Sequence, residues 1–334
     1  MNSLTPQVAV IILNWNGERL LKEYLPTVVR HTPAIGRVVV ADNGSTDGSL
    51  ELLRSEFPQV EVMAFDRNYG FAEGYNRAIA ARTEPYCVLL NSDVEVKDDW
   101  LSALYRFMDR NEHVAACQPK IRALRAPGSF EYAGASGGFI DRNGYPYCRG
   151  RIFATVEEDC GQYDEPRTDL FWATGACLMV RTALYNRAGG LDPKFFAHME
   201  EIDLCWRLQL MGYRIAVVPA AVVYHLGGGS LEASNPRKTY LNFRNNLLML
   251  HKNLPDTSRR AKLLRRRLLD TVAWAKFVIA FDFKNAAAIL RAHRDFRRMS
   301  RDYTVHPQVD LLAPNRTNIL TAYYLKRRHR FSDL

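Results

Sequence analysis

Four short apolar runs, each followed by polar residues, constrain the fold of this chain more than any other feature. The runs are Val8–Leu13, Val38–Val40, Val60–Phe65 and Val88–Leu90. Continuous apolar runs such as Val8–Leu13 and Val88–Leu90, bounded by turn-forming residues, are typical of strands that are buried on both faces of a sheet, and Val60–Phe65, which contains Glu61, is expected to be a further strand. Helical patterns separate the runs. Strand and helix therefore alternate with short connections, which predicts an α/β fold with a parallel sheet and right-handed crossovers.

The tripeptide Asn91-Ser92-Asp93 directly follows the last of these runs. Ligands of open α/β sheets bind at the carboxyl ends of the strands. A carboxylate and a carboxamide held on a rigid strand end suit a hard divalent cation, which in turn binds phosphate oxygens. The alternative is a turn that uses these side chains only for hydrogen bonds to its own backbone.

Further amide and acidic side chains are expected at the same edge, in the segments Asn14–Asn16, Asp42–Asp47 and Asn68–Asn76. Neither GxGxxG nor GxxxxGK[ST] opens a helix here, which disfavours a classical dinucleotide fold and a P-loop enzyme. The polar set suits a base, a ribose and a metal-bridged diphosphate instead.

Acidic residues also begin a predicted helix within Phe195–Met211, at Glu200, Glu201 and Asp203. Glu200 and Asp203 are three residues apart and are expected to share one helix face, whereas Glu201 points elsewhere. A carboxylate here could deprotonate a hydroxyl group. The alternative is a solvated helix start in which acids are favoured by the helix dipole.

His225 ends the last predicted strand of the body, Ile215–Tyr224, and precedes a glycine run, Gly227–Gly229. An imidazole at a strand end is a candidate nitrogen ligand of a metal, with the glycine loop as a lid. The alternative is a structural, hydrogen-bonded histidine.

Three other segments give expectations about local structure. Asn143-Gly144 predicts the turn of a hairpin, and Phe171–Val180 predicts a strand interrupted by Gly175-Ala176. Asn68–Gly74 is expected to be a glycine-rich turn, with a helix opening at Tyr75.

Positive charge is concentrated at the end of the chain. From Arg237 onward there are 22 Lys and Arg against 7 Asp and Glu, a net charge of +15, whereas the preceding part carries −6. Two basic amphipathic helices with aromatic residues are expected beyond residue 250, which favours contact with an anionic membrane surface. The alternative is a helical hairpin packed on the body with a solvated basic face. No nucleic-acid-binding motif supports a third possibility.

The spacing of the cysteines, the first residues of the chain and the length of its apolar segments bear on the compartment and the membrane topology. The six cysteines show no CxxC pair and no zinc spacing, which favours reduced core thiols and a cytosolic setting. The segment Met1–Gln7 does not look like a signal peptide. No window of about 18 uninterrupted apolar residues predicts a membrane-spanning helix.

Seven motifs taken in order resemble the family 2 glycosyltransferases of the GT-A fold, within them the bacterial rhamnosyltransferase-like branch. The resemblance covers roughly Val8 to Leu250. It rests on IILNWNG at 11–17, VVVADNGSTDGS at 38–49, NYGFAEGYN at 68–76, LLNSDVEV at 89–96, ATGACLMVR at 173–181, FFAHMEEIDLCWRLQLMGYRI at 195–215 and VYHLGGGS at 223–230. Each motif alone is weak, and their order is what makes the resemblance specific.

The resemblance implies roles for these residues. Asp42 would accept a hydrogen bond from the pyrimidine N3, and the Asn14–Asn16 turn would flank the base and ribose. Asn91 and Asp93 occupy the DXD position, where the family often has Asp first; Asp93 is therefore expected to be the main carboxylate ligand of Mg²⁺ or Mn²⁺. The residues implied in donor binding are Asn14, Asn16, Asp42, Asn68, Asn76, Asn91 and Asp93.

The same resemblance places a metal ligand and a base in the second half of the chain. His225 matches the position that completes the metal shell in similar enzymes. Glu201 matches the base of a motif that usually reads Glu-Asp; here it reads Glu200-Glu201, so the base is Glu201 or its neighbour Glu200. One base without a second nucleophile suggests a single displacement with inversion at the anomeric carbon.

The sequence therefore predicts a GT-A domain over residues 1–250 and a basic helical extension over 251–334. The predicted activity is transfer of a sugar, by resemblance rhamnose from dTDP-rhamnose, or else a UDP-linked sugar, to a glycan or polyprenyl-linked acceptor. The protein is expected in the cytoplasm, on the inner face of the cell membrane. The alternatives are a sugar nucleotidyltransferase, whose basic Gly-rich loop the turn at Asn14–Gly17 does not provide, and a non-catalytic protein that binds anionic surfaces.

Overall fold

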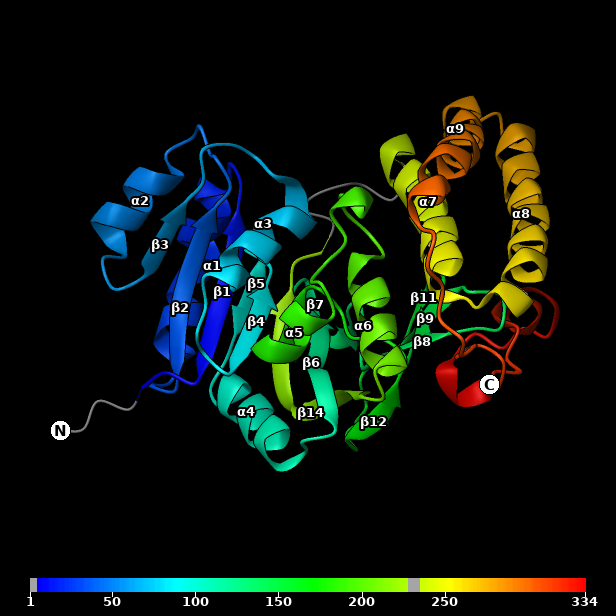
Figure 1. Ribbon diagram of the computed structural model, residues 1–334. Coiled ribbons are helices and arrows are strands. Elements are labelled where there is room, and N and C mark those ends of the chain that lie inside the picture. The colour runs from blue at the N-terminus through cyan, green and yellow to red at the C-terminus, as the bar shows by residue number, and fades with distance from the viewer. Residues whose placement is uncertain (1–4, 228–234) are drawn as a thin grey trace.

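The computed structural model describes residues 5–227 and 235–334 and contains one large sheet with helices on both faces (Figure 1). The strands are β1 Val8–Asn14, β2 Gly36–Asp42, β3 Glu61–Ala64, β4 Tyr86–Leu90, β5 Val94–Val96, β6 Val114–Ala123, β7 Ala126–Phe130, β8 Gly138–Ile140, β9 Pro146–Cys148, β10 Arg151–Ile152, β11 Thr155–Val156, β12 Arg167–Leu170, β13 Cys177–Arg181 and β14 Arg214–His225. The α-helices are α1 Glu18–His31, α2 Ser49–Glu56, α3 Gly70–Ala80, α4 Trp100–Arg110, α5 Thr182–Arg187, α6 Glu200–Leu210, α7 Pro236–Asn253, α8 Asp256–Ile279 and α9 Phe283–Met299. The predicted fold class, a mostly parallel sheet flanked by helices with a helical C-terminal part, is confirmed.

The order of strands in the large sheet places the polar strand ends side by side. From one edge the order is β3-β2-β1-β4-β13-β6-β14-β12, and the first four strands are parallel. Asn14 of β1 is the partner of Asp42 on β2, and Ile12 is the partner of Leu90 on β4. The carboxyl ends of β1, β2 and β4 therefore lie at the same edge, as the sequence predicts.

Alternating side chains of β1 enter two different hydrophobic cores, one on each face of the sheet. Val8, Val10 and Ile12 pack in the core that α1, α2 and α4 cover. Ala9 and Ile11 pack in the core that includes α3, α5 and α6. Burial on both faces explains why β1 is a continuous apolar run, whereas β3, at the edge of the sheet, is only partly buried.

A second, four-stranded sheet, β11-β10-β9-β8, contains the predicted hairpin. Strands β8 and β9 are antiparallel, and Asp141 N donates to Tyr145 O across the turn at Asn143-Gly144. The predicted strand Phe171–Val180 is correct only in its second half, because β13 starts at Cys177. The backbone N–H groups of Phe171 and Trp172 instead donate to Gly138 O of the second sheet.

Helix α3 begins five residues earlier than predicted. Asn68 Oδ1 accepts from Gly70 N and thereby supports the helix start. The prediction of a turn at 68–74 was wrong because Gly74 serves packing rather than a turn: a Cβ at this position would lie 2.8 Å from the Leu13 side chain. The glycine allows helix α3 to approach strand β1 closely.

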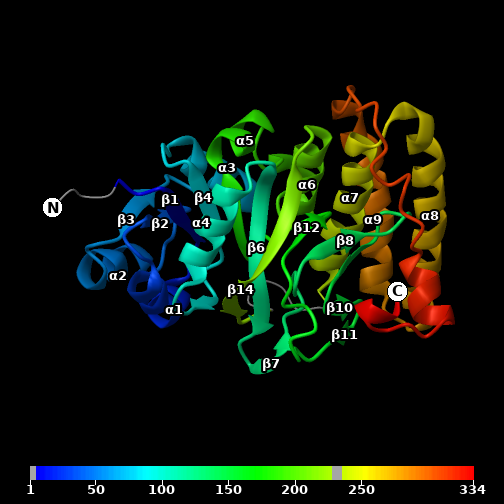
Figure 2. The ribbon, with the colours of Figure 1, turned by 90° about the horizontal axis from the view of Figure 1, so that it is seen from below.

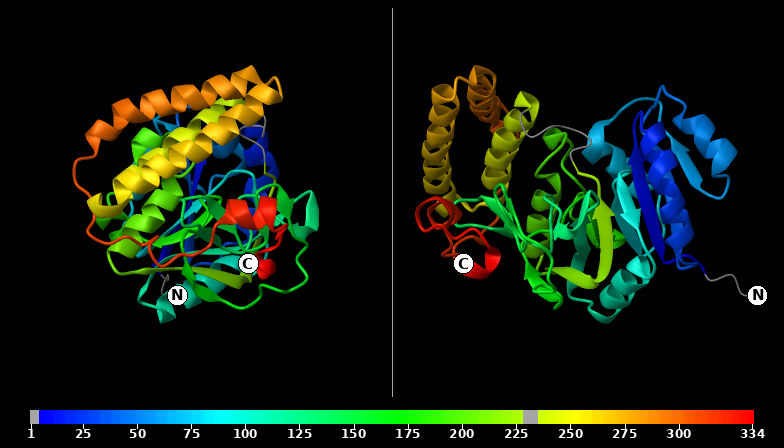
Figure 3. Two further views of the ribbon diagram at one scale, coloured as in Figure 1. Left: turned by 90° about the vertical axis from the view of Figure 1, so that its right-hand side faces the viewer. Right: turned by 180° about the vertical axis from the view of Figure 1, so that it is seen from behind.

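Helices α7, α8 and α9 form a helical layer beside α6, and α8 is the outermost helix in Figures 1 and 2. Figure 3 shows α8 and α9 from the side. After α9 the chain returns to the second sheet, where the ring of Phe331 lies 4.9 Å from that of Phe139. The predicted boundary at residue 250 falls inside α7, and the division into 1–250 and 251–334 stays a prediction.

Three further expectations from the sequence concern membrane-spanning helices, the cysteines and the glycine run. None of the helices in residues 5–227 and 235–334 has the length and hydropathy needed to cross a bilayer. All six cysteines are free thiols, and every one except Cys160 is buried. Of the glycine run predicted as a lid, Gly228 and Gly229 lie outside the described part of the chain.

Candidate active site

The ends of β1 and β2 are joined by their own side chains. Asn14 Nδ2 donates to Asp42 Oδ2 over 2.9 Å, and Ser45 N donates to Asp42 Oδ1 over 2.9 Å. Asp42 is completely buried. Its carboxylate therefore fixes the loop after β2 against the end of β1, and its role as acceptor of a pyrimidine N–H stays a prediction.

Asn16 connects the same two loops from the other side. It has a positive φ of 50°, and its Oδ1 accepts from Thr46 N over 2.7 Å. Between Asn14 and Asn16, the Trp15 side chain is 57% exposed. Its indole is an apolar platform at the polar sheet edge, where a nucleobase could stack. The sequence analysis did not single out Trp15, although a large aromatic residue within a polar turn is a usable signal.

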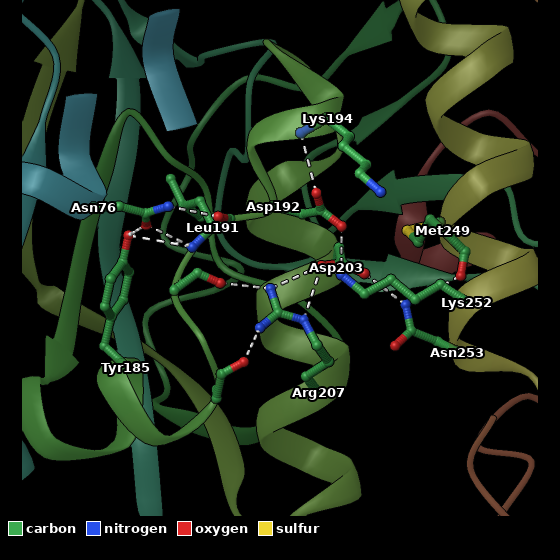
Figure 4. A network of polar contacts seen from close by, with 12 residues as sticks. Asn76, Tyr185, Leu191, Asp192, Lys194, Asp203, Arg207, Met249, Lys252 and Asn253 are labelled. Carbon is green, nitrogen blue, oxygen red and sulfur yellow. Dashed lines mark hydrogen bonds and ion pairs between the residues drawn. The ribbon is translucent and has the colours of Figure 1, made fainter. Parts of the chain in front are cut away.

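Asn68 lies beside the loops after β1 and β2, whereas Asn76 makes its hydrogen bonds elsewhere. Asn43 Nδ2 donates to Asn68 Oδ1 over 3.0 Å, which ties the start of α3 to the end of β2. In contrast, Asn76 Nδ2 donates to Leu191 O and Asn76 Oδ1 accepts from Tyr185 OH (Figure 4). The Asn76 amide thus links α3 to the segment after α5 and is not directed to the sheet edge.

Asp93 and His225 meet because β5 pairs with the end of β14. His225 is the register partner of Val94, and Leu226 N donates to Asp93 O. His225 Nε2 lies 3.1 Å from Asp93 Oδ1 and 3.3 Å from Asn91 Nδ2. The sequence prediction that these three residues converge is therefore consistent with the geometry.

A further carboxylate, Glu131, stands behind His225. Glu131 Oε2 lies 3.3 Å from His225 Nδ1, an ion-pair distance without hydrogen-bond alignment. Burial alone would lower the pKa of His225, but the carboxylates of Asp93 and Glu131 outweigh it and raise this pKa to about 10. The sequence analysis missed Glu131, which follows β7 and belongs to no motif.

The fit of this group to a divalent cation can be judged from its donor atoms. Among residues 5–227 and 235–334, no cluster of three or more His, Cys, Asp or Glu side chains could enclose a metal alone. Two neighbouring ligands of an octahedral ion with bonds of about 2.1 Å lie about 3 Å apart. The Asp93–His225 distance of 3.1 Å matches this spacing. A carboxylate behind the other imidazole nitrogen is also typical of metal-binding histidines. The residues therefore fit a cation that takes its other ligands from a diphosphate.

Glu200 and Glu201 begin α6, and within residues 5–227 and 235–334 nothing forms a hydrogen bond with the Oε2 atom of either. The Oε2 atoms of both residues are buried. Burial raises the pKa of Glu201 to about 7. Burial, with the neighbouring charge of Glu201, also raises the pKa of Glu200 well above its ordinary value. A carboxyl group with a pKa near 7 is suited to accept a proton at neutral pH.

In contrast to the two glutamates, Asp203 has a carboxylate that is bonded by three neighbouring side chains. Arg207 Nε donates to its Oδ2 over 2.9 Å, Lys252 Nζ to the same oxygen over 3.0 Å, and Asn253 Nδ2 to Oδ1 over 2.7 Å (Figure 4). Because Glu200 and Asp203 are buried, the alternative of a solvated acidic helix start is wrong. Asp203 attaches α6 to α7.

The small residues Gly175 and Ala176 lie between the His225 group and the α6 acids. Asn91 N donates to Ala176 O over 3.0 Å. A Cβ at Gly175 would lie 3.8 Å from Glu201 Cβ. The two parts of the site are therefore separated by two small residues, and the structure brings Asn91, Asp93, His225 and Glu201 to one region.

Comparison with known proteins agrees with this geometry. Residues 9–160 match the family model "Glycosyl transferase family 2". The chain is 26% identical over 237 residues to the N-acetylglucosaminyl-diphospho-decaprenol L-rhamnosyltransferase of Mycobacterium tuberculosis, covering 66% of this chain and 76% of that protein.

Two solved structures have a similar fold. S. aureus TarS 1-349 in complex with UDP-GlcNAc has a TM-score of 0.58 at 16% identity, covering 87% of this chain and 80% of that one. The mannosyltransferase PcManGT of Pyrobaculum calidifontis, in complex with GDP-Man and Mn²⁺, has a TM-score of 0.53 at 16% identity, covering 90% and 84%. The family match places residues 9–160 in glycosyltransferase family 2, and the two solved structures show that the chain has a GT-A fold.

Proposed function

We propose that this glycosyltransferase moves rhamnose from dTDP-rhamnose, or another sugar from a UDP-linked donor, to a hydroxyl group of a lipid-linked or cell-surface polysaccharide precursor. The observation that carries the proposal is the position of the Asp93–His225 pair across Gly175-Ala176 from Glu201, whose Oε2 has no hydrogen-bond partner among the described residues. The name of the mycobacterial relative supports rhamnose and a polyprenyl-linked acceptor.

The nucleoside of the donor would lie over the loops after β1 and β2. Trp15 offers the exposed aromatic face, and Asn16 and Asp42 hold the loop backbones that would face the base and ribose. Asn68 fixes the neighbouring start of α3 through Asn43. These residues are already engaged with one another, so the donor would bind to loops that need little reordering.

Asp93 and His225 would hold Mg²⁺ or Mn²⁺, with Asn91 beside them. The bound cation would neutralise the diphosphate leaving group as a Lewis acid. Mn²⁺ in the Pyrobaculum structure supports this assignment. Glu131 would keep the His225 ring oriented with Nε2 toward the site.

Glu201, or Glu200 in its place, would act as the general base. Its carboxylate would take the proton of the acceptor hydroxyl while the hydroxyl oxygen forms a bond to the anomeric carbon. The bond between that carbon and the diphosphate oxygen breaks with its electron pair remaining on the diphosphate. A single displacement of this kind inverts the anomeric configuration, and the partnerless Oε2 of Glu201 supports the assignment.

We also propose that the protein works in the cytoplasm, on the inner face of the cell membrane, where a polyprenyl-linked acceptor is anchored. The net charge of +15 from Arg237 onward supports contact between the C-terminal helices and anionic lipids.

A thermal-shift screen of nucleotide sugars tests the proposed donor and metal. A ligand that binds only the folded protein stabilises it by about 2.7 kcal/mol at one hundred times its Kd. We expect dTDP-rhamnose with Mn²⁺ to raise the Tm more than Mn²⁺ alone, dTDP-rhamnose with chelator, or ADP-glucose with Mn²⁺. A UDP-sugar as the strongest ligand would change the proposed donor. The absence of a shift with every nucleotide sugar would refute the proposal.

A further inference from the structure

Helix α8 has its polar side turned toward the protein. Its only fully buried residues are Arg266 and Asp270. Arg266 Nε donates to Asp270 Oδ1 over 2.8 Å, and Asp270 Oδ2 lies 3.0 Å from His293 Nε2 of α9. Arg266 also donates to Asn246 of α7. Hydrogen bonds and ion pairs thus form the fully buried part of the contact between α8 and its neighbours, and Leu263 packs against the hydrophobic core beside them.

The outer side of α8 carries apolar side chains at helical spacing. Leu264, Leu268 and Val272 follow one another at intervals of four residues and are 61%, 63% and 68% exposed. At the end of the helix, the apolar surface continues through exposed Ile279, Phe281 and Phe283. A helix on the surface of a soluble protein normally exposes its polar side, whereas this outer face of α8 is apolar and is left uncovered by the described residues.

Between Arg260 and Lys284 the exposed charges are all positive. Arg260, Arg265, Lys276 and Lys284 are exposed, whereas Asp270 and Asp282 are buried or half-buried. The exposed Asp256, at the start of α8, is paired with Arg259. Next to Arg265, a cavity of about 370 Å³ is also lined by Arg142, Lys262 and Arg316. An apolar stripe bordered by cations and a basic cavity is complementary to acyl chains below a layer of anionic headgroups.

We propose that the outer face of α8, from Leu264 to Phe283, inserts into an anionic lipid bilayer. The inference deepens the membrane contact of the proposed function and assigns it to one helix face. A second copy of the chain is a poorer occupant, because a two-fold contact through this face would bring the same cations together. The helix would lie in the plane of the interface, with its polar side still bound to α7 and α9.

Sedimentation with vesicles tests the assignment. We expect the full-length protein to bind vesicles of equal phosphatidylglycerol and phosphatidylcholine, and to bind phosphatidylcholine vesicles at least tenfold more weakly. The triple variant Leu264→Ser, Leu268→Ser, Val272→Ser should lose at least tenfold in affinity for the anionic vesicles. Val305→Ser with Val309→Ser, which alters exposed apolar residues after α9, is the matched control and should bind as the wild type does.

Two results would overturn the proposal: vesicle binding by the triple variant equal to that of the wild type, or a lipid-independent dimer that the triple variant abolishes. Sugar transfer to a water-soluble acceptor analogue separates this inference from the proposed function. The triple variant should retain that transfer. Loss of vesicle binding with retained transfer supports the α8 surface, whereas absence of transfer in the wild type would refute the proposed activity alone.

A separate observation concerns the segment before α6. Phe196, His198 and Met199 have φ values of 66°, 70° and 74°. Residues other than glycine rarely adopt this left-handed conformation, and surrounding contacts must maintain it. Glu200 and Glu201 follow this segment directly. Its conformation therefore determines where the α6 carboxyl groups lie.

Two buried residues of α7 supply the maintaining contacts. Asn245 Nδ2 lies 2.9 Å from Phe195 O, 2.8 Å from Ala197 O and 2.8 Å from His198 O. Arg244 donates to Phe195 O over 2.9 Å and to Lys194 O over 3.1 Å. Asn245 Oδ1 accepts from Arg244 Nε over 2.8 Å, so the two side chains orient each other.

We infer that Arg244 and Asn245 are positioning residues for the base on α6. This inference rests on the proposed role of Glu201. Neither side chain is directed at the sheet edge, and both act through the backbone of residues 194–198. A change at Asn245 should displace the carboxyl group without altering the donor loops on β1 and β2.

The neighbouring residue provides a matched control. Asn246 is also buried, but its Nδ2 donates to Gly144 O over 2.7 Å, away from the 194–198 segment. Asn245→Ala and Asn245→Asp, which both lose the donor group, should lower kcat at least tenfold and change the KM for the donor less than twofold. Asn246→Ala should retain kcat within twofold when assayed well below its Tm.

An equal fall in kcat for Asn245→Ala and Asn246→Ala would assign Asn245 to general stability and refute the positioning role. An unchanged kcat in Asn245→Asp would do the same. The Glu201→Gln variant is assayed in parallel. Full activity of that variant would refute the proposed base, while the kcat of the Asn245 variants still reports whether the segment controls catalysis.

Discussion

The donor side and the base side of the site are built differently. On the donor side, Asn14, Asp42 and Asn68 lie in a network of hydrogen bonds within the loops after β1 and β2. On the base side, the Oε2 atoms of Glu200 and Glu201 have no hydrogen-bond partner in the described part of the chain, and the backbone before them is held by hydrogen bonds from α7. The groups that would bind the donor already form hydrogen bonds with one another before the donor arrives. The base, in contrast, can accept a proton near neutral pH because burial raises its pKa.

The largest expected effect is that of Glu201→Gln on turnover. Removing a general base typically costs a factor of about 100 to 10,000. We expect kcat to fall within this range while the Kd for the nucleotide sugar, measured by calorimetry, stays within twofold. Glu200→Gln is the matched control that decides between the two acids. Loss of donor binding in Glu201→Gln would contradict the division of the site into two sides.

The second effect concerns the cation and belongs to the donor side. Asp93→Ala and His225→Ala should weaken Mn²⁺ binding, measured directly by electron paramagnetic resonance, beyond detection. Glu131→Gln should weaken it by about 10- to 100-fold, as expected when the partner of a ligand is lost. Asp109→Ala, an exposed acid on α4, is the control and should bind as the wild type does. Unchanged Mn²⁺ binding in Asp93→Ala would refute the assigned ligands.

The pH dependence of the base side should appear in both rate and stability. Burial raises the pKa of Glu201 from 4.5 to about 7, so kcat/KM should rise with pH through about 7 as the base loses its proton. The folded protein keeps this proton between pH 4.5 and 7, where the unfolded chain has released it. The free energy of unfolding should therefore fall as pH rises through this window. Urea unfolding of the wild type and Glu201→Gln checks this, because the variant should show a smaller fall. An equal fall in both would contradict the shifted pKa.

The position of the strand ends could be predicted from local sequence, whereas the residues that hold His225 and the segment before α6 in place could not. Apolar runs that end in Asn14, Asp42 and Asn91 reveal parallel strand ends, which meet at one edge by the geometry of the sheet. Glu131, Arg244 and Asn245 act through a ring nitrogen and backbone carbonyls, and such contacts leave no periodic pattern.

The orientation of the C-terminal helices could not be predicted from the sequence either. Their basic amphipathic character follows from composition and spacing. Which side of α8 faces the protein depends on Arg266 and Asp270 finding partners on α7 and α9. Those partners are distant in the sequence, so the spacing of residues in α8 could not show that Arg266 and Asp270 face the protein.

Asn76 gives the smallest expected effect on activity and the sharpest check of where the donor side ends. The sequence implied a donor-binding residue, whereas in the structure its amide bonds Leu191 and Tyr185. Asn76→Ala should lower the free energy of unfolding by about 1–3 kcal/mol, because partly buried polar groups lose their partners, and should leave the donor Kd unchanged. Asn16→Ala, on the loop beside Trp15, should weaken donor binding with less effect on stability. A weaker donor affinity in Asn76→Ala with unchanged stability would extend the donor side along α3, because only direct contact with the nucleotide sugar would produce that combination.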